Sequence, residues 1–196
     1  SSIASYYSRI PVAHVEAGLR TYNKWQPFPE ELNRRITGVI ADLHLAPTNT
    51  AKANLIREGV PENQVLVTGN PVIDSLQQIS DQPAPENLLK HINDIRQTPN
   101  KDRLRLILVT AHRRESFGSG MEAICLALKD LANRYQDKIH LLYSVHLNPE
   151  VSKPAHSILG DVSNITLLPP LDYLSMVHLM KNSYLVLTDS GGIQEE

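Results

Sequence analysis

Three short polar stretches of the chain have residue types that suit chemistry on an anionic, phosphorylated substrate. The first is His112-Arg113-Arg114-Glu115, which follows the unbroken apolar run Leu104–Val109. An arginine binds phosphate through its forked guanidinium, and a histidine can transfer a proton near neutral pH. An apolar run bounded by polar residues predicts a buried strand, and doubly wound sheets bind ligands beyond the carboxyl ends of their strands. This stretch therefore predicts a site for a polyanion that carries a leaving group.

The second stretch, His14-Val-Glu-Ala-Gly-Leu-Arg20, is paired with Pro29-Glu30-Glu31 and offers two carboxylates for acid/base chemistry. Glu16 follows a predicted strand, and the next glycine permits a sharp turn. Glu30 has a second interpretation, because proline followed by acidic residues is also a common helix start. The two carboxylates come from different segments, so only the fold can bring them together.

The third stretch, Asp189-Ser-Gly-Gly-Ile-Gln-Glu-Glu196, predicts a phosphate-binding turn. Backbone N–H groups at Ser190, Gly191 and Gly192 can face an anion, and a following helix adds the positive end of its dipole. Glu195 and Glu196 would lie one turn further, where a carboxylate can accept hydrogen bonds from ribose hydroxyls. The alternative is a tight strand-to-helix turn whose acidic residues only stabilise the helix dipole. His146 also follows a predicted strand and is a further candidate, although a lone histidine is more often structural.

Strand-like and helix-like segments alternate along the chain, which predicts parallel sheets covered by helices. The predicted domains are residues 1–71, the end of one Rossmann-like domain, and residues 72–196, most of a second. Proline-rich residues Asp81–Asp102 are the candidate connection between them. The predicted strands are Ile10–Val15, His44–Ala46, Val65–Thr68, Leu104–Val109, Ile139–Val145, Ile165–Leu168 and Leu185–Leu187, and the predicted helices are Pro29–Ala41, Thr48–Gly59, Pro71–Ile79, Met121–Tyr135 and Tyr173–Lys181.

Composition narrows the function further. The 196 residues have a net charge of −2 and no block of basic residues, which argues against nucleic acid or a membrane surface as a partner. The single cysteine, Cys125, lies in a helical apolar pattern and is expected in the core. The absence of a signal peptide pattern and of a long apolar run predicts a cytoplasmic protein. The chain starts with Ser1 and ends where a helix should begin, so a fragment is expected.

Gly118-Ser-Gly120-Met-Glu-Ala123 matches a loose dinucleotide fingerprint, but the first glycine lies too far beyond its strand. No nicotinamide or other cofactor and no metal are expected.

Five blocks, in order over nearly the whole chain, together resemble the bacterial non-hydrolysing UDP-N-acetylglucosamine 2-epimerases. The blocks are His14–Thr21, Pro27–Arg34, Thr68–Asp74, Val109–Glu115 and Asp189–Glu196. The resemblance implies a GT-B-like α/β fold with two Rossmann-like domains, the first incomplete here. It implies reversible interconversion of UDP-GlcNAc and UDP-ManNAc, by elimination of UDP to 2-acetamidoglucal and its re-addition. It further implies a homodimer that supplies ManNAc-type sugars for surface polysaccharide.

The resemblance also implies roles for individual residues. Glu16 and Glu30 match catalytic carboxylates, and His112 matches a catalytic or phosphate-contacting histidine. Ser190 and Gly192, with Gly191 between them, match diphosphate contacts, and Glu196 matches the ribose-binding carboxylate. Arg113 matches a position linked to a second, regulatory UDP-GlcNAc in some members.

Two departures from the family pattern are visible. An N-terminal basic pair and a catalytic aspartate have no counterpart here, so the 196 residues alone are expected to be inactive. Leu171 and Met176 replace a glutamine and an aromatic residue near the uracil. Three other functions share some of these features: a hydrolysing epimerase, a GT-B glycosyltransferase and a non-catalytic UDP-sugar sensor.

Overall fold

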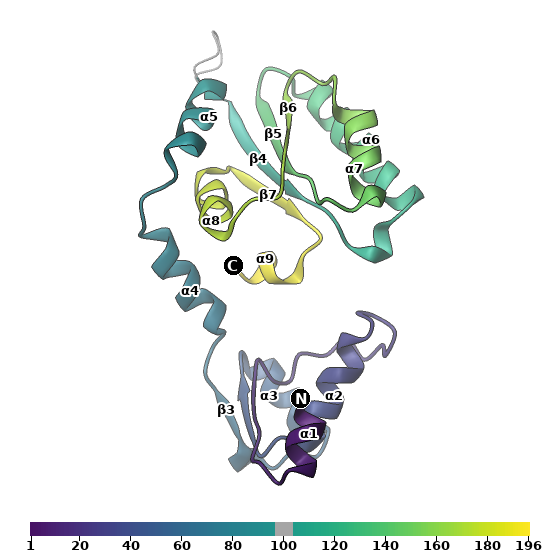
Figure 1. The fold of residues 1–196 in the computed structure, drawn as a ribbon, viewed down its shortest axis with the longest axis vertical. Helices are drawn as coiled ribbons and strands as arrows, with labels where there is room; N and C mark the ends of the chain where they lie inside the picture. The colour runs from purple at the N-terminus through teal and green to yellow at the C-terminus, as the bar shows by residue number, and fades with distance from the viewer. Residues whose placement is uncertain (97–103) are drawn as a thin grey trace. The chain divides into compact units, whose positions relative to one another are not determined.

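The computed structural model describes residues 1–96 and 104–196, and it divides the chain into two compact units (Figure 1). Unit 1 is Ser1–Asp74 and unit 2 is Ser75–Glu196. The division falls within helix α4 (Pro71–Ser80), near the boundary that the sequence places between residues 71 and 72. Residues 97–102 of the predicted connection lie outside the described residues.

Unit 1 is a three-stranded parallel sheet with helices packed on it. The strands pair in the order β1-β2-β3, with His44 of β2 opposite both His14 and Val65. A small core forms between the sheet and α3, where Leu55 is fully buried against alanines of the sheet and its loop. The elements are α1 (Ser2–Tyr7), β1 (Ala13–Val15), α2 (Glu30–Ile40), β2 (Leu43–Ala46), α3 (Asn49–Arg57), the 3-10 turn η1 (Glu62–Gln64) and β3 (Val65–Val67).

Unit 2 is a four-stranded parallel sheet in the order β6-β5-β4-β7. The chain runs outward from β4 to β6 and then returns to place β7 on the other side of β4. The strand order therefore reverses between β4 and β7, and a parallel sheet binds ligands at such a switch point. The strands are β4 (Arg105–Thr110), β5 (Ile139–Ser144), β6 (Ile165–Leu168) and β7 (Leu185–Thr188).

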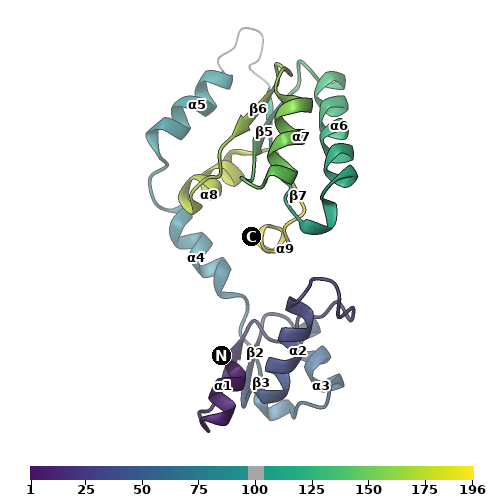
Figure 2. The same cartoon turned by 45° about the vertical axis from the view of Figure 1, so that its right-hand side comes forward.

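Helices cover both faces of this sheet, with α6 and α7 on one face and α5 and α8 on the other (Figure 2). Residues of β4 alternate between the two cores: Ile107 and Val109 face α6 and α7, while Leu106 and Leu108 face α5 and α8. Cys125 is buried in the first core, as predicted. The remaining elements are α5 (Glu86–Arg96), η2 (Arg114–Ser116), α6 (Ser119–Arg134), α7 (Pro149–Leu159), α8 (Tyr173–Asn182) and α9 (Gly191–Glu195).

Three helices differ from the sequence prediction, and the first of them, α1, covers residues for which no element is predicted. Helix α5 lies in the segment predicted to connect the domains, but Leu88 and Ile92 are buried in the core of unit 2, so this helix is part of that unit. Helix α7 was not predicted, and it contains Pro154, which removes one backbone donor. Its buried residues Val151 and Ala155 are four apart, and this apolar stripe packs against α6 and maintains the helix.

Candidate functional site

Glu16 is exposed at the carboxyl end of β1 and has a left-handed backbone, with φ of 61°. This conformation is uncommon for residues other than glycine and often marks a functional position. The following residue is held to the sheet, because the Ala17 N–H donates to the Leu45 carbonyl at 3.0 Å. The turn thus leaves the Glu16 carboxylate outside the buried core. It lies at the carboxyl end of the parallel sheet, which is the end where such folds bind ligands.

Gly18 makes this turn possible. Its φ is +88°, and a Cβ there would lie 2.2 Å from the backbone oxygen of Ala51. The Asn54 side-chain amide donates to the Gly18 carbonyl at 3.0 Å, which holds the turn on α3. Arg20, whose side chain is fully buried, then forms a bidentate pair with Glu58 at 2.8 and 2.9 Å. The loop that carries Glu16 is therefore fixed from both sides.

Glu30 and Glu31 have different environments although they are adjacent. Glu31 is fully buried, and its carboxylate accepts the backbone N–H groups of Thr21 and Tyr22, both at 3.1 Å. Glu30 is the exposed first residue of α2, and within the described part of the chain its side chain has no hydrogen bond or ion pair. The structural role at this helix start belongs to Glu31, and the carboxylate of Glu30 is free for another purpose.

Two neighbouring histidines lie on β1 and β2, and one of them, His14, is two residues before Glu16. The rings of His14 on β1 and His44 on β2 have centroids 6.3 Å apart, and the Nδ1 atom of each is buried without a hydrogen bond within residues 1–96 and 104–196. Burial, followed by the nearby positive groups of His44, Arg20 and Arg34, lowers the pKa of His14 to about 4. Burial also lowers the pKa of His44. Both rings are therefore neutral at physiological pH.

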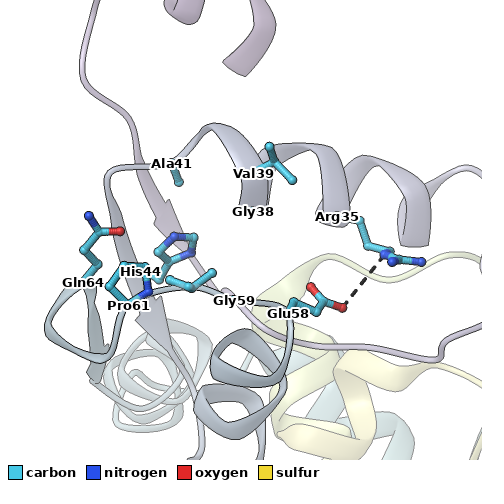
Figure 3. Close-up of a pocket in the computed structure, with 10 residues that line it drawn as sticks. Arg35, Gly38, Val39, Ala41, His44, Glu58, Gly59, Pro61 and Gln64 are labelled. Carbon is cyan, nitrogen blue, oxygen red and sulfur yellow. Dashed lines mark ion pairs between the residues drawn. The ribbon is translucent and has the colours of Figure 1, made fainter.

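A cavity of about 260 Å³ lies in unit 1 between the end of α2 and the segment before β3 (Figure 3). His44 lines it, and so does the loose ion pair between Arg35 and Glu58, whose Nε–Oε1 distance is 3.9 Å. His44 belongs to the amino-terminal half of β2, whereas Glu16 follows the carboxyl end of β1. The cavity is thus at the sheet end that parallel folds do not use for substrates, and we do not assign it to the site.

In unit 2, His112 is held at the switch point by Asp189. The backbone N–H groups of His112 and Arg113 donate to Asp189 Oδ2 at 2.9 and 2.8 Å. The other carboxylate oxygen, Oδ1, lies 3.8 Å from His112 Nδ1. These contacts join the residues that follow β4 to the residue that follows β7.

The ends of β4 and β7 are also joined by their hydroxyl side chains. Thr110 and Thr188 share a hydrogen bond of 2.7 Å, and Thr188 Oγ1 accepts the Ser190 N–H at 3.0 Å. Ser190 precedes α9, and the Arg113 guanidinium lies so near that a Cβ on Gly191 would be 3.3 Å from its Nη2 atom. A positive side chain, two glycines and a helix start therefore lie together, an arrangement suited to an anion.

His146, which follows β5, packs on His112. The two rings are stacked with centroids 5.5 Å apart and planes 7° apart. The Asn148 N–H donates to His146 Nδ1 at 3.1 Å, so this nitrogen acts as an acceptor. The structure thus brings His146 together with the residues predicted at the end of β4.

Glu196 interacts with Tyr173 at the start of α8. The Tyr173 hydroxyl bonds its carboxylate and favours the charged form, but burial has the larger effect and raises the pKa of Glu196 above its usual value. The Glu196 carboxylate is therefore partly desolvated, and a hydroxyl group of a ligand can compete with the Tyr173 hydroxyl for it.

Sequence reasoning missed three residues that support the site: Glu31, Asp189 and Tyr143. The Tyr143 hydroxyl donates to the Ala111 carbonyl at 2.9 Å, directly before His112, and burial raises its pKa. Asp189 and Glu31 are each next in sequence to a predicted site residue. Only the structure shows that their carboxylates accept backbone N–H groups. No hydrogen bond or ion pair joins Glu16 to Glu30 in the described ranges.

A family model described as UDP-N-acetylglucosamine 2-epimerase matches residues 1–196. The chain belongs to the UDP-N-acetylglucosamine 2-epimerase family. A relative of this name from Yersinia pestis is 50% identical over 196 residues, and one from Escherichia coli strain K12 is 50% identical over 199 residues. All of this chain is covered in both cases, but the chain spans only 52% of each relative's length.

Solved structures of this epimerase family share the fold. The Neisseria meningitidis UDP-GlcNAc 2-epimerase bound to UDP-GlcNAc is 44% identical, with a TM-score of 0.86 over all of this chain and 52% of its own. The S. aureus MnaA–UDP structure is 44% identical, with a TM-score of 0.89 over all of this chain and 51% of its own. These similarities confirm the GT-B-like α/β fold class.

Residues 1–96 and 104–196 contain no group of three or more His, Cys, Asp or Glu side chains that could hold a metal ion. In the same ranges, none of the helices has the length and apolar character needed to cross a membrane.

Proposed function

We propose that the full-length protein containing this chain interconverts UDP-GlcNAc and UDP-ManNAc by inverting C2 of the sugar. The observation that carries the proposal is the family match over residues 1–196, together with related structures that hold UDP-GlcNAc or UDP. The product would supply ManNAc-type sugars for a surface polysaccharide. The enzyme would act as a cytoplasmic homodimer without a cofactor.

The reaction begins with loss of the C2 proton and of UDP from C1, which leaves 2-acetamidoglucal. UDP then adds back at C1 as a proton is delivered to the opposite face of C2. Acid/base groups on two faces are required, because the proton leaves one face and arrives at the other. Glu16 and Glu30 are our candidates, and their exposure after the end of β1 and at the start of α2 supports this role.

The departing UDP must be held while the glucal forms. We assign this task to His112, Ser190, Gly191 and Gly192, with Arg113 as a regulatory or substrate contact. The support is local: the Arg113 guanidinium adjoins Gly191 at the start of α9, and positive groups at such positions stabilise a diphosphate leaving group. His146 supports the His112 ring from one side.

Glu196 is proposed to bind the ribose. Its carboxylate is partly desolvated and already accepts the Tyr173 hydroxyl, so it is competent to accept hydroxyl donors. The uracil contacts are not assigned, since Leu171 and Met176 replace the side chains that some members use there.

Product analysis tests this function. Full-length enzyme incubated with UDP-GlcNAc should form UDP-ManNAc and reach the same mixture from either sugar nucleotide. A hydrolysing epimerase would instead accumulate free ManNAc and UDP, and a glycosyltransferase would consume UDP-GlcNAc only with an acceptor present. Either of these results, separated by anion-exchange chromatography, would contradict the proposal.

A further inference from the structure

The two carboxylate oxygens of Asp189 have different environments. Oδ2 accepts two backbone N–H groups, from His112 and Arg113. Oδ1 is buried and has no hydrogen bond in the described ranges, although His112 Nδ1 is 3.8 Å away. A buried carboxylate oxygen without a donor is unfavourable, so a protonated Nδ1 that moves slightly closer would satisfy it.

This arrangement determines which ring nitrogen of His112 carries the proton in the neutral ring. A proton on Nδ1 faces a negative oxygen, whereas a bare Nδ1 would place its lone pair against that oxygen. Among the described residues, the charged and titratable groups recorded at this position are Asp189, Arg113, the stacked His146 and Tyr143, and Asp189 is the negative one at neutral pH. The proton is therefore held on Nδ1, and Nε2 is presented as the reactive nitrogen.

His146 has the opposite arrangement. Its Nδ1 accepts the Asn148 N–H, so its ring proton must be on Nε2. The two stacked rings are chemically distinct, although both follow strands of the same sheet. Two positive rings with centroids 5.5 Å apart would repel each other, and the Asp189 carboxylate lies beside His112, so a second proton on this pair is more favourable on the His112 ring.

We propose that Asp189 is a positioning residue that holds His112 in the Nδ1–H tautomer and directs Nε2 toward the diphosphate. The catalytic part of this inference rests on the proposed epimerase function. When UDP leaves, His112 Nε2 would donate its proton to a diphosphate oxygen, and it would recover that proton when UDP returns. His112 is therefore an imidazolium, stabilised by Asp189, before UDP leaves and again after it returns, and between these steps the ring is neutral with its proton on Nδ1.

The substitution Asp189→Asn tests the role of the charge. An asparagine can keep an acceptor oxygen on the two backbone N–H groups, but its amide then presents N–H to His112 Nδ1. The tautomer should reverse, and kcat should fall by about 10²-fold or more, as expected when a proton-transfer group is misoriented. The Kd for UDP should stay within about threefold, because the backbone turn is kept.

The direct readout is the ¹⁵N NMR spectrum of the histidine rings in the full-length protein at a pH where the rings are neutral. The wild-type protein should show a protonated Nδ1 at His112 and a protonated Nε2 at His146. Asp189→Asn should reverse the His112 pattern alone. Asp161→Asn is the matched control, since Asp161 is an exposed aspartate before β6, and it should leave both patterns and kcat unchanged.

A wild-type His112 with its proton on Nε2 would overturn the proposal, and this measurement remains decisive if Asp189→Asn fails to fold. An Asp189→Asn enzyme with normal kcat and unchanged ring signals would overturn it as well. Failure of the epimerase function is distinguishable, because the wild-type enzyme would then form no UDP-ManNAc whatever the tautomer of His112.

Discussion

The adjacent residues Glu30 and Glu31 at the start of α2 differ in role because their side chains have different environments. Glu31 is buried and accepts two backbone N–H groups, whereas Glu30 is exposed and has no hydrogen-bond or ion-pair partner among the described residues. The sequence Pro-Glu-Glu is compatible with a structural role for either residue. The structure assigns the structural role to Glu31, which strengthens the case for Glu30 as an acid/base group.

Glu30→Gln and Glu16→Gln should each lower kcat of the full-length enzyme by about 10²–10⁴-fold, because an amide cannot exchange the proton. The Kd for UDP and the free energy of unfolding should change little. Glu31→Gln is the matched control and should lower the free energy of unfolding by about 1–3 kcal/mol, since one oxygen becomes a donor that faces backbone N–H groups. Rate assays and urea denaturation measure these effects. Normal turnover by Glu30→Gln would support its interpretation as a simple helix start.

Ser190→Ala and Glu196→Gln should act on UDP binding instead. Each removes a contact to a part of the substrate that does not react at C2, so the Kd for UDP should rise by about tenfold, as for the loss of one good hydrogen bond. Calorimetric titration with UDP measures this change. A large fall in kcat with an unaltered Kd would show that these residues act in the chemical step.

His14 makes the stability of unit 1 sensitive to acid. Its pKa of about 4 in the folded state is below the 6.5 of the unfolded chain, so the unfolded state binds more protons between these values. Stability is therefore lost as pH falls from 6.5 toward 4, by at most about 3 kcal/mol and by less if solvent screens the ring. His14→Gln should reduce the loss measured by urea denaturation at pH 7 and pH 4.5. His156→Gln, at an exposed histidine, should have no such effect, and equal effects of both would contradict this account.

At the scale of elements, the turn after β1 depends on Gly18. Gly18→Ala should destabilise the protein by about 3 kcal/mol or more, because it adds a collision with the Ala51 carbonyl to the 1–2 kcal/mol of left-handed strain. Gly59→Ala is the matched control: its φ is +94°, but a Cβ there meets nothing within 4 Å, so only the strain applies. Equal changes in unfolding free energy for the two variants would show that the contact with α3 is unimportant.

Most elements could be predicted from the sequence because alternating apolar runs and helical patterns are local signals. Strand β4 is an example, since Leu106, Leu108 and Val109 are buried on both faces of the sheet. Helix α7 was missed because Pro154 is a local signal against a helix, and packing on α6 overrides it. Asp189 was missed as a site residue because its role arises from a contact across 77 residues, and no local pattern contains that information.

At the scale of the whole molecule, the chain spans about half the length of the relatives that it matches. The predicted catalytic carboxylates are in unit 1, and the predicted diphosphate and ribose contacts are in unit 2. We predict that residues 1–196 alone bind UDP through the contacts of unit 2 but do not turn over UDP-GlcNAc. Robust turnover by the 196-residue chain would show that the essential groups have been misassigned.

The central claim is that the reaction proceeds by cleavage of the C2–H bond, and an exchange experiment in D2O tests it most directly. Full-length enzyme and UDP-GlcNAc should give a second UDP-sugar in the proton NMR spectrum, with deuterium replacing hydrogen at C2 in both sugars. Formation of UDP-ManNAc that retains its C2 proton would contradict the mechanism, and the absence of both exchange and a second UDP-sugar would contradict the proposed function.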